Sequence, residues 1–310
     1  MASQRDVKNR ISSVKNIQKI TSAMEMVAAA RLRKAEQRIE ELRPYASAIR
    51  RMTRRVVEAA EHVPDLPILE EHDSTDKVGL LLVTGDRGLA GAFNSQIIRA
   101  GNRRRGELRE EGTDVLWYAS GRRGVSSIEF RGYGLENGYT GFTDRPAYDD
   151  ARTIADDLTS AYTDGKLDRV EIIYNGYISP LTQEVRSEVL LPMQQIEFLA
   201  EEGDEEGESD GEGKDDGADD PGHHKTLWIY EPDPEEILRR LIPDYVEISI
   251  FRALLESTAS EHGARMTAMR SASDNASDLI DDLTLEANRV RQAEITQEIM
   301  EVVAGAEGLR

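Results

Sequence analysis

The residues best suited to chemistry in this 310-residue chain form a glycine-rich stretch, Gly85-Asp-Arg-Gly-Leu-Ala-Gly91, which follows a short apolar run. A glycine-rich turn between a strand and a helix can hold a phosphate group on its backbone N–H groups. The spacing here is G-x-x-G-x-x-G, whereas dinucleotide-binding turns have G-x-G-x-x-G, and the G-x-x-x-x-G-K-[ST] motif is absent from the sequence. Asp86 also brings a negative charge that disfavours an anion. We therefore expect a tight turn that closes a domain or meets a partner.

Other chemistries lack the residues that they need. The chain has no cysteine, which excludes disulfides, thiolate metal sites and cysteine catalysis. It also lacks an H-E-x-x-H motif and a G-x-S-x-G nucleophile turn. His223 and His224 follow an acidic run and could bind a divalent ion, but a solvated loop is the expected interpretation. We therefore predict no catalytic residue, no metal site and no bound cofactor.

Both ends of the chain have the pattern of a long helix. Residues 5–57 contain one proline and no glycine, and their apolar side chains recur every three or four positions. Residues 235–304 repeat this stripe with one early proline and one glycine. At about 1.5 Å per residue, such helices would be roughly 80 Å and 100 Å long.

Helices of this length cannot lie inside a compact globule, and a mean apolar spacing near 3.5 residues is typical of coiled coils. Because the two helices lie at opposite ends of the chain, they can pair only if the middle folds back, which predicts an antiparallel pair. Residues 1–60 carry fourteen Lys/Arg against six Asp/Glu, a net +8, whereas residues 233–310 carry eight arginines against sixteen acids, a net −8. These opposite charges favour pairing. The alternative is two amphipathic helices packed on a larger core.

The middle of the chain alternates between strand and helix patterns. Strand patterns occur at residues 77–84, 114–119 and 169–174, and more exposed ones at 183–191 and 226–230. Helix patterns occur at residues 94–111, with Asn94 as the expected N-cap, and at 122–130 and 148–162. Such alternation predicts a largely parallel sheet with helices packed on it.

The expected fold class is therefore α/β, with an antiparallel coiled coil of long N- and C-terminal helices and a central Rossmann-like α/β domain. We predict three parts: an N-terminal coiled-coil helix at residues 1–60, the α/β domain at 75–231, and a C-terminal coiled-coil helix at 232–310. Residues 201–225 interrupt the second part. They are rich in glycine and acids and contain no aromatic residue, so we expect a disordered acidic loop.

Charge is unevenly distributed along the chain. Its formal net charge is −20, but residues 201–220 alone contain twelve carboxylates and one lysine, a net −11. The polar first twenty residues have no apolar core of a secretory signal, and the apolar runs are too short to span a bilayer. We therefore expect a soluble, cytoplasmic protein. The overall acidity argues weakly against nucleic acid as the main partner, although the basic N-terminal segment keeps that alternative open.

Four segments, in the same order along the chain, resemble the γ-subunit family of F-type ATP synthases. They are NRISSVKNIQKITSAMEMVAAARLRKA at 9–35, GDRGLAGAFN at 85–94, YEPDPEEIL at 230–238 and ASEHGARMTAMRSASDNASDLI at 259–280, and the likeness continues to residue 309. The resemblance implies a central rotor shaft without catalytic activity of its own. The paired terminal helices would enter a ring of three α and three β subunits, and the α/β domain would lie beside the ε subunit and the membrane ring of c subunits.

The resemblance also implies a peripheral protein at the cytoplasmic face of the cell membrane, where it couples proton-driven rotation of the c ring to ATP synthesis or hydrolysis at the β sites. Neither nucleic acid nor a small-molecule substrate is implied. Residues that match positions near the β-subunit contact are Lys19, Met24, Arg265, Gln292, Thr296 and Glu298. Residues expected at the foot, near ε and the c ring, are Asp86, Arg87, Trp228, Tyr230 and Glu231.

Two alternatives belong to other functional classes. The first is a nucleotide-binding α/β enzyme with helical extensions, which the glycine spacing and the missing catalytic groups disfavour. The second is a coiled-coil adaptor or nucleic-acid-binding protein with an α/β domain, which would use the basic N-terminal helix and bind with a steep dependence on salt. Co-purification with α and β subunits would separate the rotor shaft from both.

Overall fold

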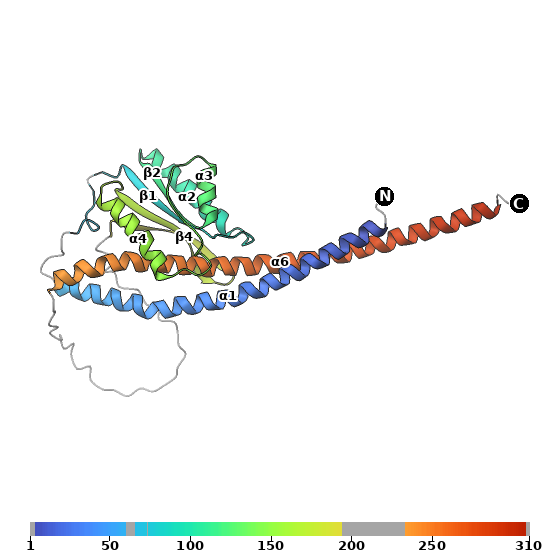
Figure 1. Ribbon diagram of the computed structural model, residues 1–310, viewed down its shortest axis with the longest axis horizontal. Helices are drawn as coiled ribbons and strands as arrows, with labels where there is room; N and C mark the ends of the chain where they lie inside the picture. Colours follow the sequence, from blue (N-terminus) through green and yellow to red (C-terminus); the bar gives the residue numbers. More distant parts are fainter. Residues whose placement is uncertain (1–3, 60–65, 73, 194–232, 308–310) are drawn as a thin grey trace, which may run out of the picture.

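Two long helices extend along the whole molecule in the computed structural model, which describes residues 4–59, 66–72, 74–193 and 233–307. Helix α1 spans Gln4–Ala59 and has 56 residues, and helix α6 spans Pro234–Glu307 and has 74 residues. They lie side by side in opposite directions, and the C-terminal end of α6 extends past the start of α1 (Figure 1). A helix of 74 residues is about 110 Å long. The predicted antiparallel arrangement of the long helices is confirmed.

Each long helix continues through a proline, Pro44 in α1 and Pro243 in α6. A proline removes one backbone hydrogen bond, and packing along the rest of the helix compensates for this loss. In the middle of the pair, Leu32 and Ala35 of α1 pack on Ala259 of α6, and all three are buried. Small side chains at this level let the two backbones come close together.

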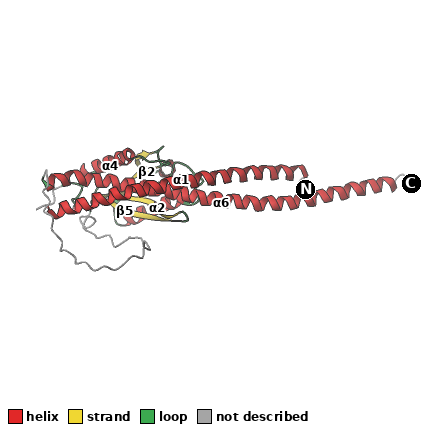
Figure 2. Cartoon of the chain, turned by 90° about the horizontal axis from the view of Figure 1, so that it is seen from below, coloured by secondary structure: helices red, strands yellow, loops and turns green. Residues whose placement is uncertain are grey.

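The apolar stripe of α1 is only partly buried, contrary to the sequence-based expectation. Val7, Leu32 and Val56 are at most 3% exposed, whereas Ile17 and Ile20 are 53% and 59% exposed. The α/β domain lies beside only part of the length of α1 (Figure 2), and α6 is the helix that α1 packs on. Exposed apolar side chains on a long helix are typical of a surface that meets a partner.

A five-stranded sheet forms the centre of the α/β domain, with the strand order β3-β2-β1-β4-β5. Its strands are β1 (Lys77–Val83), β2 (Asp114–Ser120), β3 (Leu135–Tyr139), β4 (Arg169–Ser179) and β5 (Thr182–Leu191). The first four are parallel, and β5 pairs with β4 as an antiparallel hairpin. The prediction of a largely parallel sheet in an α/β fold is confirmed.

Helices cover both faces of the sheet and explain why β1 is almost entirely apolar. Leu81 and Val83 pack towards α4 (Tyr148–Thr163) and the first half of α6. Leu80 and Leu82 point to the other face, where α2 (Phe93–Glu110) and α3 (Arg122–Phe130) lie. Helix α6 therefore runs between the sheet and α1, as Figure 1 shows.

The observed elements agree with most of the predicted ones and differ at two points within the described residues. Strand β3 was not predicted, because its sequence LENGY has no apolar alternation and its residues are largely exposed at the sheet edge. Asn94 does not cap α2; its side-chain oxygen instead accepts a hydrogen bond from the Gly85 N–H at 2.8 Å. The predicted strand at 226–230 and the acidic loop at 201–225 lie outside the described residues. Within the described parts, no helix is apolar over a length that could cross a bilayer.

Candidate functional site

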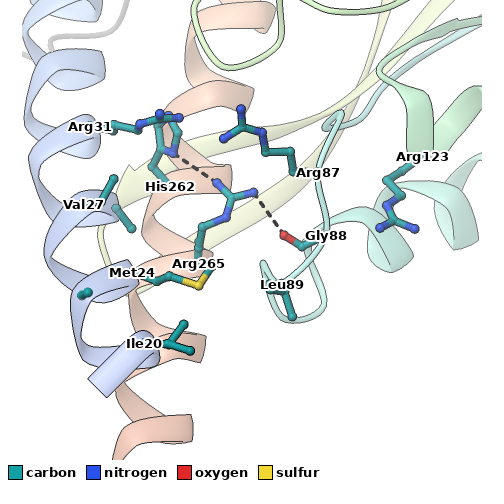
Figure 3. A pocket seen from close by; sticks show the side chains of 12 residues that line it. Ile20, Met24, Val27, Arg31, Arg87, Gly88, Leu89, Arg123, His262 and Arg265 are labelled. Atoms are coloured by element: carbon teal, nitrogen blue, oxygen red, sulfur yellow. Dashed lines mark hydrogen bonds between the residues drawn. The ribbon is translucent and has the colours of Figure 1, made fainter. Parts of the chain in front are cut away.

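A half-open cavity of about 620 Å³ lies where α1, α6 and the loop after β1 meet (Figure 3). Helix α1 contributes apolar side chains, α6 contributes His262 and Arg265, and the loop contributes Arg87 and Leu89. The complete lining is Ile20, Ala23, Met24, Val27, Ala28, Arg31, Arg87, Gly88, Leu89, Arg123, His262 and Arg265. An apolar floor with four arginines around it fits an apolar and acidic surface of a partner better than a small neutral molecule.

Leu89 is at the apex of the loop and faces α1 across the cavity (Figure 3). Its side chain is 63% exposed, and its φ of 61° lies in the left-handed region that leucine rarely adopts. Holding a non-glycine residue in this conformation costs roughly 1–2 kcal/mol. A large apolar side chain kept exposed in a strained conformation is a mark of a contact residue.

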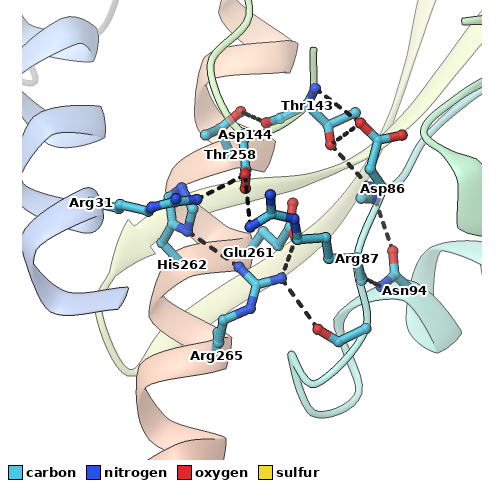
Figure 4. A network of polar contacts seen from close by, with 12 residues as sticks. Arg31, Asp86, Arg87, Asn94, Thr143, Asp144, Thr258, Glu261, His262 and Arg265 are labelled. Carbon is cyan, nitrogen blue, oxygen red and sulfur yellow. Dashed lines mark hydrogen bonds and ion pairs between the residues drawn. The ribbon is translucent and has the colours of Figure 1, made fainter. Parts of the chain in front are cut away.

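Arg265 fastens this loop to α6. Its guanidinium donates to the Glu261 carboxylate one turn earlier and to the Gly88 carbonyl at 3.3 Å (Figure 4). A second nitrogen lies 3.3 Å from Nδ1 of His262, which serves as the acceptor. The loop can approach so closely because residue 85 is glycine: a Cβ there would lie 2.7 Å from the Glu261 carboxyl group. Glu261, His262 and Arg265 are all at least 90% buried.

Burial sets the ionisation of this cluster. Burial raises the pKa of Glu261, while the adjacent Arg265 guanidinium opposes that rise. Burial, with the positive charge of Arg265, lowers the pKa of His262 to about 4. His262 is therefore neutral at pH 7, its Nδ1 accepts from Arg265, and its ring donates to the backbone of Asp144. A protonated ring would lose the acceptor and place a cation beside Arg265.

The low pKa of His262 predicts acid sensitivity of the fold. Because the folded-state pKa of about 4 lies below the ordinary value of 6.5, the unfolded chain binds this proton more readily, and stability falls as the pH drops from 6.5 towards 4. A shift of this size corresponds to roughly 3 kcal/mol at the acidic end of that window. Urea unfolding of the His262→Gln variant should show a shallower fall over this range than the parent chain. Parallel pH profiles of the two proteins would contradict this assignment. The pKa of Glu261 is also raised, but Glu261 is present in both proteins and therefore does not account for a difference between their pH profiles.

The Asp86 carboxylate is bound within the domain, at the start of α3 and on the loop between β3 and α4. This carboxylate accepts hydrogen bonds from the N–H of Arg122, the first residue of α3, at 3.0 Å and from the N–H of Gly141 at 2.9 Å. It also accepts from the Thr143 hydroxyl at 3.0 Å. The helix N-terminus that could hold an anion is therefore already neutralised by a side chain. The expected tight turn is present, and its glycine-rich sequence serves packing against α3 and α6.

Asp144 joins the loop to α1. Arg31 of α1 donates to its carboxylate at 2.7 Å, and Arg87 of the loop lies 3.2 Å from the same oxygen. Burial would raise the pKa of Asp144, but the hydrogen bond and charge of Arg31, together with Arg87, lower it below its usual value. The carboxylate is therefore ionised and bridges two elements that are far apart in the sequence.

The structure brings together only some of the residues predicted to be functional. Met24, Arg87 and Arg265 line one cavity, and Asp86 anchors its loop. Lys19 is exposed on α1 but does not line the cavity. Gln292, Thr296 and Glu298 are exposed near the end of α6, about 40 Å beyond Arg265 along the helix. Trp228, Tyr230 and Glu231 lie outside the described residues.

Two of the residues expected at the foot, Asp86 and Arg87, have contacts within the chain. Asp86 and Arg87 lie beside the middle of α6, about thirty residues from its start at Pro234, in the same network as Arg265. The Asp86 carboxylate is bound within the domain. Their contact with a foot partner stays a prediction, whereas the contact of Asp86 with α3 and the contact of both residues with the loop between β3 and α4 are observed.

Glu261, His262 and Asp144 were not singled out from the sequence. For Glu261 a local signal existed, because Glu261 and Arg265 have the i,i+4 spacing of a helical ion pair. No local signal marks Asp144, whose partner Arg31 is 113 positions away. Only the three-dimensional structure shows that these residues belong to one network.

Comparisons with known proteins agree with this architecture. The sequence profile of a family described as ATP synthase matches residues 3–309. A protein named ATP synthase gamma chain from Rubrobacter xylanophilus is 44% identical over 309 residues, covering 100% of this chain and 99% of the relative. Another of that name from Moorella thermoacetica is 42% identical over 310 residues, covering 100% of both chains.

Solved structures show the same fold at low sequence identity. A chain in the cryo-EM structure of the Euglena gracilis mitochondrial ATP synthase (OSCP/F1/c-ring, rotational state 3) has a TM-score of 0.66 and 18% identity, covering 99% of this chain and 94% of that one. A chain in the Tetrahymena thermophila mitochondrial ATP synthase central stalk/c-ring structure has a TM-score of 0.57 and 22% identity, covering 82% and 99%. With a profile match over nearly its whole length and relatives above 40% identity, this chain belongs to the ATP synthase gamma chain family.

Proposed function

We propose that this chain is the central rotor shaft of a proton-translocating F-type ATP synthase. In this role it couples rotation of a membrane c ring to conformational change at catalytic β sites, during synthesis or hydrolysis of ATP. The observation that carries the proposal is the full-length match to gamma chains, combined with two antiparallel helices that extend far beyond the α/β domain. The shaft itself has no catalytic role in this account; it shifts conformational equilibria in its partners through different contacts at each angle.

The three parts of the chain would serve different partners. Residues 1–60 and 232–310 would wind around each other as an antiparallel coiled coil inside a head of α and β subunits. Residues 75–231 would form a Rossmann-like domain at the foot, beside the ε subunit and the c-subunit ring, with Trp228, Tyr230 and Glu231 among the contacts. The complex would place this chain at the cytoplasmic face of the membrane as a peripheral subunit.

The cavity at the junction would contact the catalytic head. Met24 and Leu89 provide exposed or half-exposed apolar surface, and Arg87 and Arg265 provide positive charge beside it. Lys19 extends the basic surface further along α1. An acidic and apolar segment of a neighbouring subunit would match this combination, because aromatic, aliphatic and arginine side chains dominate strong interfaces.

Co-purification tests the proposal directly. A tagged version of this chain can be co-expressed with the α and β subunits of an organism whose gamma chain is similar to it. It should copurify with both subunits in a complex that hydrolyses ATP. A chain that purifies alone, or that retains nucleic acid in a salt-dependent manner, would support the adaptor alternative instead.

The far end of α6 gives a second prediction. Gln292 and Thr296 are exposed there, and the Thr296 hydroxyl donates to the Gln292 carbonyl at 2.8 Å. Replacing both with leucine should lower proton-driven ATP synthesis by roughly tenfold, because bulky apolar groups replace polar contacts with the head. Thr284→Leu is the matched control for the helix itself, since Thr284 donates to the Ile280 carbonyl at 2.7 Å. Unchanged ATP synthesis by the double variant would show that neither Gln292 nor Thr296 takes part in coupling.

A further inference from the structure

One loop of the α/β domain reaches past α6 to hold α1. The loop between β3 and α4 contains Asp144, which accepts the 2.7 Å hydrogen bond from Arg31 of α1. Two residues later, the Pro146 carbonyl accepts a hydrogen bond from Arg38 of α1 at 3.4 Å. Arg31 and Arg38 are seven positions apart, two helical turns, so this loop follows one face of α1.

The β4–β5 hairpin reaches α1 at the same level. The Tyr177 hydroxyl of β4 donates to the carboxylate of Glu36, which lies between Arg31 and Arg38 in α1. Burial and this carboxylate raise the pKa of Tyr177, so the phenol stays protonated and remains a donor. The hairpin passes close to α6, where a Cβ on Gly263 would lie 3.0 Å from the Pro180 carbonyl. Glycine in the middle of α6 thus makes room for the hairpin.

Helix α6 lies between these two arms. The Thr258 hydroxyl donates to the Thr143 carbonyl of the loop at 2.9 Å, and the Ser260 hydroxyl donates to the Asn175 carbonyl of β4 at 3.2 Å. Ala259, between them, packs on Leu32 of α1. Within a single turn, therefore, α6 contacts the sheet, both arms and α1.

We propose that Asp144, Pro146 and Tyr177 form a helix clamp, through which the α/β domain holds α1 against α6 at one level. The function assigned to the clamp rests on the proposed role as a rotor shaft. Rotation imposed on the domain passes directly to α6, which shares a large apolar core with the sheet. Helix α1 contributes Val56 to this core. Elsewhere α1 packs directly on α6, as Leu32 and Ala35 do on Ala259, and the clamp is where the loop and the hairpin of the α/β domain bind it. The clamp residues are positioning residues that make both helices turn with the domain.

Hydrogen exchange in the isolated full-length chain tests the clamp itself. The double variant Asp144→Asn, Tyr177→Phe keeps side-chain size but removes a charge and a donor. Amides of residues 31–38 should exchange at least about tenfold faster, because charge-assisted hydrogen bonds that hold this part of α1 are lost. Tyr139→Phe is the matched control: its hydroxyl donates to Asp157 of α4 at 2.7 Å and does not reach α1. Equal exchange in the double variant, the control and the parent would overturn the clamp.

A measurement on the assembled complex tests the role of the clamp. Complexes with the double variant should retain ATP hydrolysis but lose at least half of their ATP-driven proton pumping per ATP. Because the chain has no cysteine, Glu36→Cys, Tyr177→Cys can be bridged by a bismaleimide, which should restore pumping. Full pumping by the unbridged variants would overturn the coupling role, even if exchange confirmed the clamp. Failure of the parent chain to assemble would instead reject the proposed function and leave the exchange result unaffected.

Discussion

Replacing Glu261 with alanine is expected to lower the free energy of unfolding by about 3–5 kcal/mol, because it leaves the buried Arg265 guanidinium without its carboxylate partner. Glu261 and Arg265 are 2% and 7% exposed, and their ion pair holds the loop after β1 on α6 through the Gly88 carbonyl. Neutral His262 cannot replace the lost negative charge. Urea unfolding of the isolated chain, followed by circular dichroism, measures this loss.

A second variant separates an unpaired charge from lost packing. In Glu261→Met, Arg265→Met, two apolar side chains of similar length replace the pair, and most of the lost stability should return. Arg270→Met is the matched control, because the Arg270–Glu25 ion pair joins the helices at the surface and its arginine is 61% exposed. That change should cost less than about 1 kcal/mol. A loss below about 1 kcal/mol in Glu261→Ala would contradict the account of the buried pair.

The double variant also bears on function. It should fold nearly as well as the parent but lack Arg265, the α6 guanidinium at the cavity that binds the Gly88 carbonyl of the glycine-rich loop. If Arg265 contacts the catalytic head, a complex containing the double variant should assemble and yet synthesise ATP poorly. The double variant therefore tests the stabilising role of the buried ion pair separately from the coupling role of Arg265.

Replacing Gly121 with alanine is expected to cost about 4 kcal/mol or more, which is enough to prevent accumulation of folded chain. Gly121 has a φ of 91°, and a Cβ there would lie 2.1 Å from the Thr84 carbonyl oxygen. At this point β2 ends beside the end of β1, and the Thr84 hydroxyl donates to the Ser120 carbonyl and accepts from the Gly124 N–H. The clash is with backbone, so no side chain can move aside. Soluble yield and thermal unfolding provide the measurement.

Gly132→Ala is the matched control for the backbone conformation alone. Gly132 has a φ of 68°, but nothing lies within 4 Å of a Cβ at that position. It should therefore cost only about 1–2 kcal/mol, the strain of a left-handed alanine. Equal losses of stability in Gly121→Ala and Gly132→Ala would show that the close approach of Thr84 to residue 121 contributes nothing to the loss.

Most of the fold could be predicted from local patterns. The long helices and the buried strands β1, β2 and β4 have strong periodicity or long apolar runs, and the structure confirms them. Strand β3 could not be recognised because an exposed edge strand has no apolar face. Burial of the α1 stripe was overestimated, since a stripe can be read from the sequence but the extent of its cover cannot.

The opposite net charges of the two long helices do not predict which of their side chains pair. One ion pair between α1 and α6 joins Glu25 of the basic helix to Arg270 of the acidic one, which is the reverse of the overall charge pattern. Net charge describes a segment, whereas an ion pair depends on which side chains face each other. Overall charge therefore did not identify the contacts.

The candidate site was predicted only in outline. The glycine spacing pointed to a structural turn, and Asp86 bears this out by binding the start of α3. Met24 and Arg265 came from the family resemblance, and the structure places both at one cavity. Asp144, Glu36 and Tyr177 could not have been found, because the contacts that give them a role connect residues more than one hundred positions apart.

Direct observation of rotation tests the central claim most directly. A single cysteine can be introduced at Glu129, an exposed position on α3 that carries no predicted role, and it will be unique in the chain. A bead attached to this cysteine, on a complex whose α and β subunits are fixed to a surface, reports motion of the α/β domain. We predict that ATP drives continuous rotation of the bead in one direction. A complex that hydrolyses ATP while the bead stays still would contradict the role of this chain as the rotor shaft.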